Sequence, residues 1–363
     1  MNLPQSDYLD IGRFSRILEN KSESYKLFWF KAIVDQVCSG NTEPTYEELI
    51  DNMIAEAWYM VTEFHLNLGP SDTLEKAVKR MAEISQIKSS EKKSTILEYV
   101  KQCDDKELKK HKSTLTRNVP YRLQAPFLDI EWSKSTKLLI ENINRHDHLM
   151  YYFSQINGMD THIKMDPIWT AYIETNQEII RGWIELNMIT YLQRRNPSVP
   201  GIVDKIHPPQ ERKLQKVQKY WKLLVSMGEF HEIYGGNLLD DKDISIDHFV
   251  PWSYVAHDEF WNLHPTTRSI NSSKSNSLPD WERYFPLLVD LEYASYKIMW
   301  EKDKVHQVFD QCAREHLNNE DIRYRLYRQG LDKDEFRENL GEVLTPVYQS
   351  AENAGFGRWT YNR

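Results

Sequence analysis

The residues with the clearest capacity for chemistry lie in one short stretch of the second half of the chain. They are Asp247, His248, Asn262, Asn271, Lys274 and Asn276. Asn262 follows His248 by fourteen residues and precedes Asn271 by nine. An acid beside a histidine, with two asparagines at these spacings, is typical of a metal-dependent site that breaks phosphodiester bonds.

Hydrolysis of a phosphodiester requires a base that takes a proton from water and a positive charge that stabilises the phosphate and the leaving 3′ oxygen. A histidine titrates near neutrality, which makes His248 the candidate base. A hard divalent cation keeps several waters, so one carboxylate and one amide oxygen suffice as protein ligands. Asp247 and Asn271 offer those two oxygens. Lys274, one helical turn after Asn271, could reach a phosphate.

Asp247 and His248 cannot both face one site on a flat, regular strand. The alternation Ile244-Ser245-Ile246 predicts a strand that leads into them. Neighbouring residues on a strand point to opposite faces. The strand must therefore end or twist at this point. Pro251, which cannot donate a ladder hydrogen bond, is consistent with such an end.

These residues together resemble the HNH family of nucleases, also called ββα-metal or His-Me finger nucleases. The similarity rests on Asp247-His248-x-x-Pro251, Asn262 and Asn271-x-x-Lys274-x-Asn276. The layout is similar to bacterial HNH endonucleases and to the HNH domain of RNA-guided CRISPR effector nucleases. It covers about fifty residues, 233–285, and several fixed spacings are met together.

The resemblance implies a role for each residue. Asp247 and Asn271 would bind Mg²⁺, with Mn²⁺ as an alternative ion, and His248 would be the general base. Asn262, the second catalytic candidate, would orient the His248 backbone or ring and hold the loop between the strands. Substrate contacts would come from Lys274 and Asn276. The implied fold is two antiparallel strands and a helix around one metal, with products that carry a 5′-phosphate and a 3′-hydroxyl.

Two features depart from the family pattern. Many members carry a CxxC pair that binds zinc and braces the fold, whereas Cys38, Cys103 and Cys312 are far apart. The brace must therefore come from packing, for which the aromatic residues between positions 252 and 261 are candidates. His264 stands where an apolar residue is expected. Both His264 and His257 are either extra ligands or, as we favour, loop or partly buried histidines.

The composition is that of a folded protein with a negative net charge. The chain has 363 residues, of which 40% are apolar and 12% aromatic, and a formal net charge of −8. A protein that grips long nucleic acid through many phosphates usually carries a basic balance, so any basic surface here must be local. The N-terminus lacks a basic and apolar leader, and no long apolar stretch follows, which predicts a soluble, cytoplasmic protein without membrane contact.

Residues 1–200 show helical patterns almost throughout. Thr45 and Glu48 predict a capping box, and Asp72 predicts the start of a helix over residues 73–84. The aromatic run at residues 25–30 predicts core packing rather than a platform for stacked bases. Residues 109–122 are basic and have two interpretations. They are either a surface that contacts phosphates or a solvated loop, and the second is favoured.

The remaining patterns surround the catalytic stretch. Residues 196–201 and the pair Pro208-Pro209 predict a linker. An amphipathic helix at residues 214–225 should follow and pack on the nuclease unit. Residues 231–238 predict a short hairpin or turn. Helices then resume after residue 279 and run to the end, with breaks near Gly330 and Gly341.

The sequence as a whole predicts a mainly α protein. A helical scaffold at residues 1–200 would carry a small ββα-metal unit with its packing helix at 211–285, followed by a C-terminal helical region at 286–363. The predicted function is Mg²⁺-dependent cleavage of DNA, with RNA less favoured, in a prokaryotic restriction or anti-phage defence system. The helical scaffold would recognise a target, a protein partner or a second copy of the chain. The alternative is a non-catalytic component of a defence complex that binds nucleic acid or a partner through a structural HNH unit.

Overall fold

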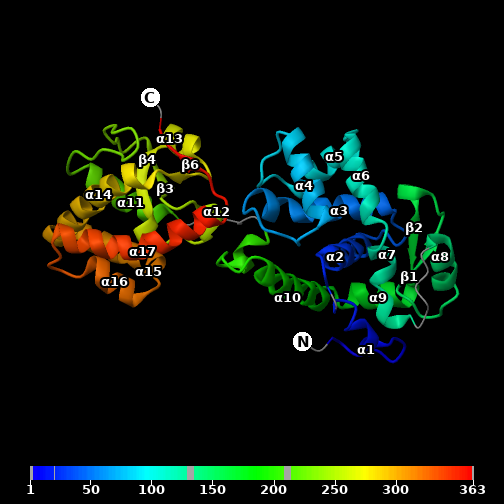
Figure 1. The fold of residues 1–363 in the computed structure, drawn as a ribbon. Coiled ribbons are helices and arrows are strands. Elements are labelled where there is room, and N and C mark those ends of the chain that lie inside the picture. Colours follow the sequence, from blue (N-terminus) through cyan, green and yellow to red (C-terminus); the bar gives the residue numbers. More distant parts are fainter. Residues whose placement is uncertain (1–2, 20, 129–134, 208–213, 362–363) are drawn as a thin grey trace. The chain divides into compact units, whose positions relative to one another are not determined.

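The computed structural model describes residues 3–19, 21–128, 135–207 and 214–361 (Figure 1). The chain forms two compact units. Unit 1 comprises Met1–Pro197 with Ile206–Pro208, and unit 2 comprises Ser198–Lys205 with Pro209–Arg363. The expected segments 211–285 and 286–363 both lie in unit 2, and their boundaries stay predictions. Pro208 and Pro209 of the expected linker lie outside the described residues.

Unit 1 is built mainly from helices, with one pair of strands. Its helices are α1 (Ile11–Phe14), α2 (Tyr25–Cys38), α3 (Tyr46–Thr62), α4 (Thr73–Ile84), α5 (Lys93–Gln102), α6 (Lys106–Leu115), α7 (Val119–Arg122), α8 (Thr136–Asn144), α9 (Pro167–Thr175) and α10 (Gln177–Arg195). Short 3-10 helices are η1 (Ala125–Phe127) and η2 (Gly158–Asp160). The strands are β1 (Tyr151–Ser154) and β2 (His162–Met165).

The two helix starts that the sequence predicts in unit 1 are confirmed. The Thr45 hydroxyl accepts from the Glu48 amide at 3.1 Å, and the Glu48 carboxylate accepts from the Thr45 amide at 2.8 Å, which completes the capping box of α3. Asp72 caps α4, because its Oδ1 accepts from the amides of Leu74 and Glu75 at 2.8 and 3.1 Å. Each cap satisfies backbone donors that have no partner within the helix.

The core of unit 1 forms where α2 packs against α3, α9 and α10. The aromatic run predicted as core is buried at residues 27–30, including Trp29 and Phe30. Tyr25 and Lys26, which begin the helix, are only half-buried. The core prediction therefore holds for all of this run except its first two residues.

The strand pair in unit 1 is an element that the helical patterns of residues 1–200 do not predict. β1 and β2 are antiparallel, with Tyr151 opposite Met165 and Ser154 opposite His162. Tyr151 and Phe153 face the core and alternate with less buried neighbours. Four residues give too few repeats for a period of two to be distinguished from a period of 3.6.

Unit 2 combines three short strand pairings with a layer of helices. Its helices are α11 (Gln215–Val225), α12 (Trp252–Val255), α13 (Arg268–Lys274), α14 (Trp281–Glu301), α15 (Asp303–His316), α16 (Glu320–Tyr327) and α17 (Lys333–Asn353), with η3 (Ile202–Lys205) and η4 (Phe260–Asn262). Its strands are β3 (Ile244–His248), β4 (Leu263–Thr267), β5 (Leu278–Pro279) and β6 (Arg358–Trp359). β3 pairs with β4, β5 pairs with β6, and an isolated bridge joins His231 to Leu238.

The amphipathic helix packs where the sequence predicts. The apolar face of α11, with Val217, Trp221 and Leu224, is buried in the core that also contains the apolar residues of β3. The Gln218 amide donates to the Ile244 carbonyl at 3.1 Å and ties the helix to the strand. Because α11 holds the first residue of β3, the helix helps to position the strand whose other end carries Asp247 and His248.

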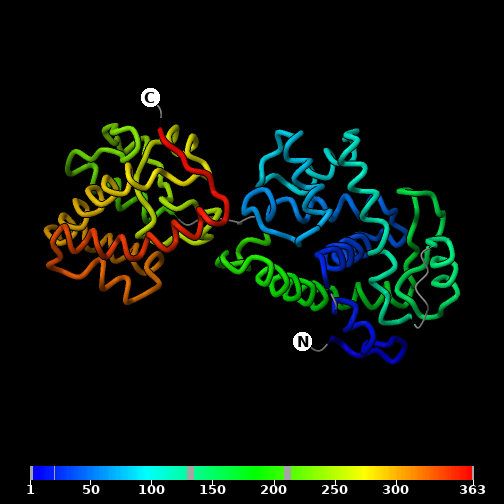
Figure 2. Tube along the Cα trace, in the orientation of Figure 1, coloured from blue at the N-terminus to red at the C-terminus, as the bar shows by residue number. Residues whose placement is uncertain are grey.

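The C-terminal region differs from the prediction at one glycine. A break near Gly330 is confirmed, since α16 ends at Tyr327 and α17 begins at Lys333, but Gly341 lies inside α17. A Cβ at Gly341 would lie 3.5 Å from the Phe285 ring of α14, an ordinary contact distance, so this glycine does not interrupt the helix. Figure 2 shows the C-terminal segment returning to the chain that follows α13, where β6 pairs in parallel with β5.

The fold is thus mainly helical and carries a small unit of two antiparallel strands and a helix, as the sequence predicts. Within the described ranges, each helix is either too short or too polar to cross a membrane.

Candidate active site

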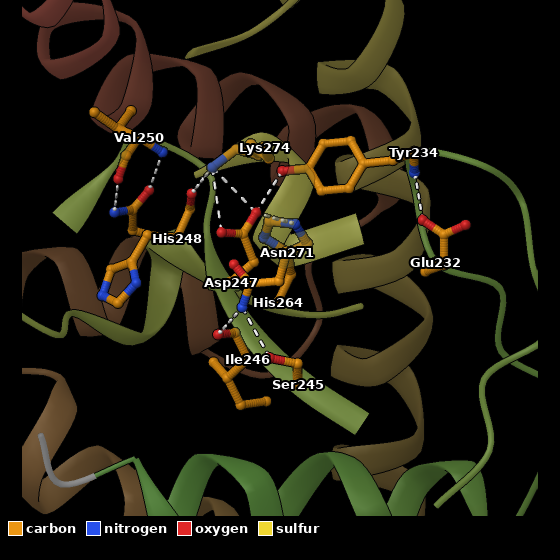
Figure 3. A network of polar contacts seen from close by, with 11 residues as sticks. Glu232, Tyr234, Ser245, Ile246, Asp247, His248, Val250, His264, Asn271 and Lys274 are labelled. Atoms are coloured by element: carbon orange, nitrogen blue, oxygen red, sulfur yellow. Dashed lines mark hydrogen bonds and ion pairs between the residues drawn. The ribbon is translucent and has the colours of Figure 1, made fainter. Parts of the chain in front are cut away.

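Strands β3 and β4 and helix α13 position the predicted residues. The strands are antiparallel, with Asp247 opposite His264 and His248 opposite Leu263. Helix α13 begins directly after β4, where the Thr267 hydroxyl accepts from the Ile270 amide at 3.4 Å. Helix α13 packs on both strands. This arrangement brings the helix residues Asn271 and Lys274 against β3 (Figure 3).

Asp247 is the centre of a buried polar cluster. Its carboxylate lies 3.2 and 3.1 Å from the Lys274 ammonium, measured to Oδ1 and Oδ2. The Tyr234 hydroxyl donates to Oδ2 at 2.7 Å, and His264 Nε2 lies 3.6 Å from the same oxygen. Asp247 is 4% exposed, and Lys274 and His264 are 0% exposed. The cluster is therefore an ion pair with one neutral donor, the Tyr234 hydroxyl, and a nearby imidazole whose two ring nitrogens are buried without a hydrogen-bond partner.

The charges in this cluster follow from burial and contact. Burial favours the neutral acid of Asp247, but the adjacent Lys274 ammonium outweighs it, with help from the Tyr234 hydroxyl, and holds the pKa below its ordinary value. Burial lowers the pKa of His264 to about 4, so this ring is neutral near pH 7. We conclude that Asp247 is ionised and that Lys274 is its counter-ion.

His248 lies at the end of β3 and points away from Asp247. Figure 3 shows the imidazole and the Asp247 carboxylate on opposite sides of the strand, as the alternation of a strand requires. His248 Nε2 is 2.8 Å from Asp258 Oδ1, and the residue is 4% exposed. The His248 carbonyl accepts from the Lys274 ammonium at 2.7 Å. The strand ends here as predicted, but the two side chains do not meet in one hollow in this structure.

Asp258 is a site residue that sequence reasoning missed. It lies in the loop after α12, which turns at Ala256 with a left-handed φ of 55°. A 2.7 Å contact between His316 Nδ1 and the Asp258 carbonyl holds the loop against α15. The only signal in the sequence is an acid ten residues after His248 in a loop. That signal is weak, because the turn that brings it back to the strand leaves no periodic pattern.

Asn262 holds the loop that follows His248. Its Oδ1 accepts from the Val250 amide at 2.8 Å, and its Nδ2 donates to the Val250 carbonyl at 2.9 Å. Its own carbonyl accepts from the Phe249 amide at 2.9 Å. These contacts match the implied role in the loop between the strands. They fix the backbone after His248 rather than its ring.

Asn271, Lys274 and Asn276, the three predicted residues in or just after α13, differ in burial and in their contacts. Asn271 donates through Nδ2 to the Ser245 hydroxyl at 2.8 Å and the Ile246 carbonyl at 3.1 Å, which leaves Oδ1 as its ligand atom. Lys274 is fully buried on Asp247, and the contact with a phosphate expected for it stays a prediction. Asn276 is half-buried two residues after α13 ends.

The donor set for a metal at this site is one carboxylate and one amide oxygen. Hard divalent ions such as Mg²⁺ take oxygen ligands and keep much of their water, so Asp247 and Asn271 fit by chemistry. Across the residues that the structure describes, no cluster of three or more His, Cys, Asp or Glu offers another metal site. The Lys274 ammonium already neutralises the Asp247 carboxylate, so a divalent ion would have to share this oxygen ligand with it.

The comparison with protein families agrees with this geometry. Residues 231–280 match a family model described as HNH endonuclease. The match spans β3, β4 and α13 and includes every residue that we single out as a candidate. No curated protein and no solved structure gave a significant match.

Proposed function

We propose, from the membership of residues 231–280 in the HNH endonuclease family, that this chain is a Mg²⁺-dependent endonuclease that cuts DNA. The observation that carries the proposal is the joint placement of Asp247 and Asn271 by β3 and α13, with His248 at the end of the same strand. The products would be a 5′-phosphate and a 3′-hydroxyl. A role in restriction or anti-phage defence rests on the resemblance alone and stays a prediction.

His248 would act as the general base. Its imidazole would take the proton from the water whose oxygen attacks phosphorus, the bond to the 3′ oxygen would break, and the leaving oxygen would take a proton from solvent. We assign proton transfer to Nδ1, because the Asp258 carboxylate at Nε2 stabilises the protonated ring through its other nitrogen. A cation held by Asp247 and Asn271 would stabilise the charge on the phosphate. Lys274 would serve as the counter-ion of Asp247.

Asp258 would then be a positioning residue for His248. We expect Asp258→Ala to lower kcat by roughly 10–100-fold, the usual effect of removing a partner that orients a functional histidine. Asp258→Asn keeps a hydrogen-bond acceptor at Oδ1 and should restore part of the loss, with KM unchanged in both variants. Steady-state cleavage of a labelled duplex measures this. Equal activity of Asp258→Ala and wild type would contradict the role.

The buried state of the site requires an opening before DNA can bind. Asp247 and His248 are each 4% exposed and lie on opposite sides of β3. We propose that the loop between His248 and Asn262 rearranges when DNA binds. Hydrogen exchange in His248→Ala protein with duplex DNA and Mg²⁺ should be faster at the Phe249 and Val250 amides, whose partner is Asn262. Unchanged exchange there, with DNA bound, would contradict the opening.

The substrate can be identified with paired oligonucleotides. Duplex DNA and duplex RNA of the same sequence are incubated with the full chain and Mg²⁺, and the ends of the products are labelled. We expect DNA to be cut, with label entering only after removal of a 5′-phosphate. RNA cut as fast as DNA would overturn the DNA assignment.

A second candidate is supported by the same burial. A chain whose base and carboxylate are both covered could be a component that binds nucleic acid or a partner without cutting. Binding to DNA that persists in EDTA, with no product from any substrate, would favour this candidate over the nuclease. Oligomeric state, protein partners and cellular location stay predictions from the sequence.

A further inference from the structure

Unit 1 contains a hollow that the nuclease proposal does not use. It has a volume of about 700 Å³ and lies between the segment that joins α1 to α2, the start of α2, and the region of α7 and η1. A second hollow of about 650 Å³ is lined by α10. Lys21 lines both hollows, so they are neighbours, and we refer to their two linings together as the cationic surface.

The side chains of this surface are mostly cationic. The cations are Arg16, Lys21, Lys26, Arg122, Arg194 and Arg195. Only two carboxylates line the same surface, those of Glu19 and Glu23. Glu19 forms an ion pair with Arg16 at 3.6 Å, and Glu23 lines the first hollow beside the other cations. A local excess of positive charge therefore exists in a chain whose formal net charge is −8.

The cations at the centre of the surface contact neutral oxygens. The Lys21 ammonium contacts the Leu18 carbonyl and lies 3.3 Å from Asn187 Oδ1. The Lys26 ammonium donates to the Glu19 carbonyl at 3.4 Å. The Arg195 guanidinium contacts the Ser22 carbonyl. Carbonyl dipoles hold these side chains in place but do not cancel their charge.

The same crowding is visible in the ionisation of the lysines. Burial lowers the pKa of Lys21, and the nearby Arg194 lowers it further. Burial also lowers the pKa of Lys26, to which Lys21 and Arg122 add. An anion that binds among these cations reduces the repulsion between them. The electrostatic free energy gained is larger in a concave, partly desolvated place than on an open surface.

The basic segment at residues 109–122 contributes to this surface at one end. Lys112 is buried on Asp51 at 2.7 Å and Glu47 at 2.9 Å, and Lys109 pairs with Asp104. Arg122 alone of these cations lines the hollow. The segment is therefore neither a continuous phosphate surface nor a solvated loop, since most of it is α6 and α7.

We propose that this cationic hollow binds a compact phosphate-bearing ligand of nucleotide size through its phosphate oxygens. Arginine and lysine together favour phosphate, because guanidinium donors match its oxygens in pairs and ammonium groups add charge. A volume of about 700 Å³ lies in the range of small-ligand sites. A duplex instead meets protein over a broad surface of many phosphates. The proposal is independent of the nuclease function and goes beyond it.

Calorimetric titration of the full chain in EDTA tests the proposal, because neither metal nor cleavage then contributes. The probes are inorganic tripolyphosphate, adenosine triphosphate and a short DNA duplex. The variant is the pair Lys21→Met and Lys26→Met, and the matched control is Lys110→Met, an exposed lysine of α6 outside the hollow. We expect both compact probes to bind wild type and control equally and to bind the double variant at least about tenfold more weakly.

The proposal would be overturned if neither compact probe binds at low salt, or if only the duplex binds. It would also be overturned if Lys110→Met loses as much affinity for the compact probes as the double variant does. If the double variant does not fold by circular dichroism, Arg122→Gln replaces it, since Arg122 is exposed at the rim. The same direction of effect is expected for that variant, and unchanged affinity would overturn the proposal as well. Loss of nuclease activity alone bears on the other unit and does not decide this test.

Discussion

His248→Ala is expected to lower the rate of DNA cleavage by roughly 10²–10⁴-fold, the usual contribution of a general base. The substitution removes the imidazole at the end of β3 and leaves the Asp247–Lys274 ion pair and the Asn271 contact with the Ile246 carbonyl in place. Its effect should therefore fall on kcat rather than on binding of DNA. Cleavage of labelled duplex under single-turnover conditions measures it, with binding measured separately by fluorescence anisotropy.

The matched control for this prediction is His231→Ala. His231 is exposed, lies in the segment that matches the family and uses its backbone for the bridge to Leu238. Its loss should leave the rate of cleavage unchanged. If His248→Ala cuts at the parental rate, His248 is not the base, and the assignment of Asp258 as its positioning residue is lost with it.

Lys274→Met is expected to have the largest effect on stability. It leaves the Asp247 carboxylate, 4% exposed, without the ammonium that neutralises it. Removing one partner of a buried ion pair typically costs about 3–5 kcal/mol. Mg²⁺ should restore part of that stability in the variant but change wild type little, because the divalent ion replaces the missing positive charge at Asp247. Urea unfolding in EDTA and in Mg²⁺ measures both effects.

The matched control is Lys333→Met, which removes an exposed ion pair of the same unit. Lys333 lies 2.7 Å from Asp290, and both side chains are more than half exposed. Exposed pairs contribute about 0–1 kcal/mol, so this variant should unfold close to wild type. A Lys274→Met protein that unfolds like Lys333→Met in both buffers would contradict the counter-ion role.

Much of the site could be predicted from the sequence because it depends on local order. The alternation through Ile246 fixes a strand, and the spacing of Asn271 and Lys274 places both on one face of the following helix. The helix starts at Thr45 and Asp72 could be predicted for the same reason, because a cap depends on residues that are close in the sequence. The position of His264 could not be predicted in this way, since it is expected in a loop or partly buried and lies fully buried in β4 opposite Asp247.

The other features of the site depend on how deeply each side chain is buried and on the conformation of the loops, and the pattern of residues in the sequence shows neither. Lys274 lies on the predicted face, but only the structure shows that it is buried on Asp247. Asp258 reaches His248 because the chain turns at Ala256. The cationic surface collects residues from the segment between α1 and α2, from α2, from α7 and from α10, whose distance along the chain hides their proximity.

The most direct measurement is the conversion of supercoiled plasmid to nicked and linear forms by the full chain. In Mg²⁺ we expect the wild-type chain to convert the plasmid, and the conversion should stop when EDTA is added. The His248→Ala chain should convert the plasmid roughly 10²–10⁴-fold more slowly. Conversion that continues in EDTA would exclude a divalent ion at Asp247 and Asn271. Intact plasmid after prolonged incubation in Mg²⁺, with DNA bound to the protein, would show that this unit does not cut DNA.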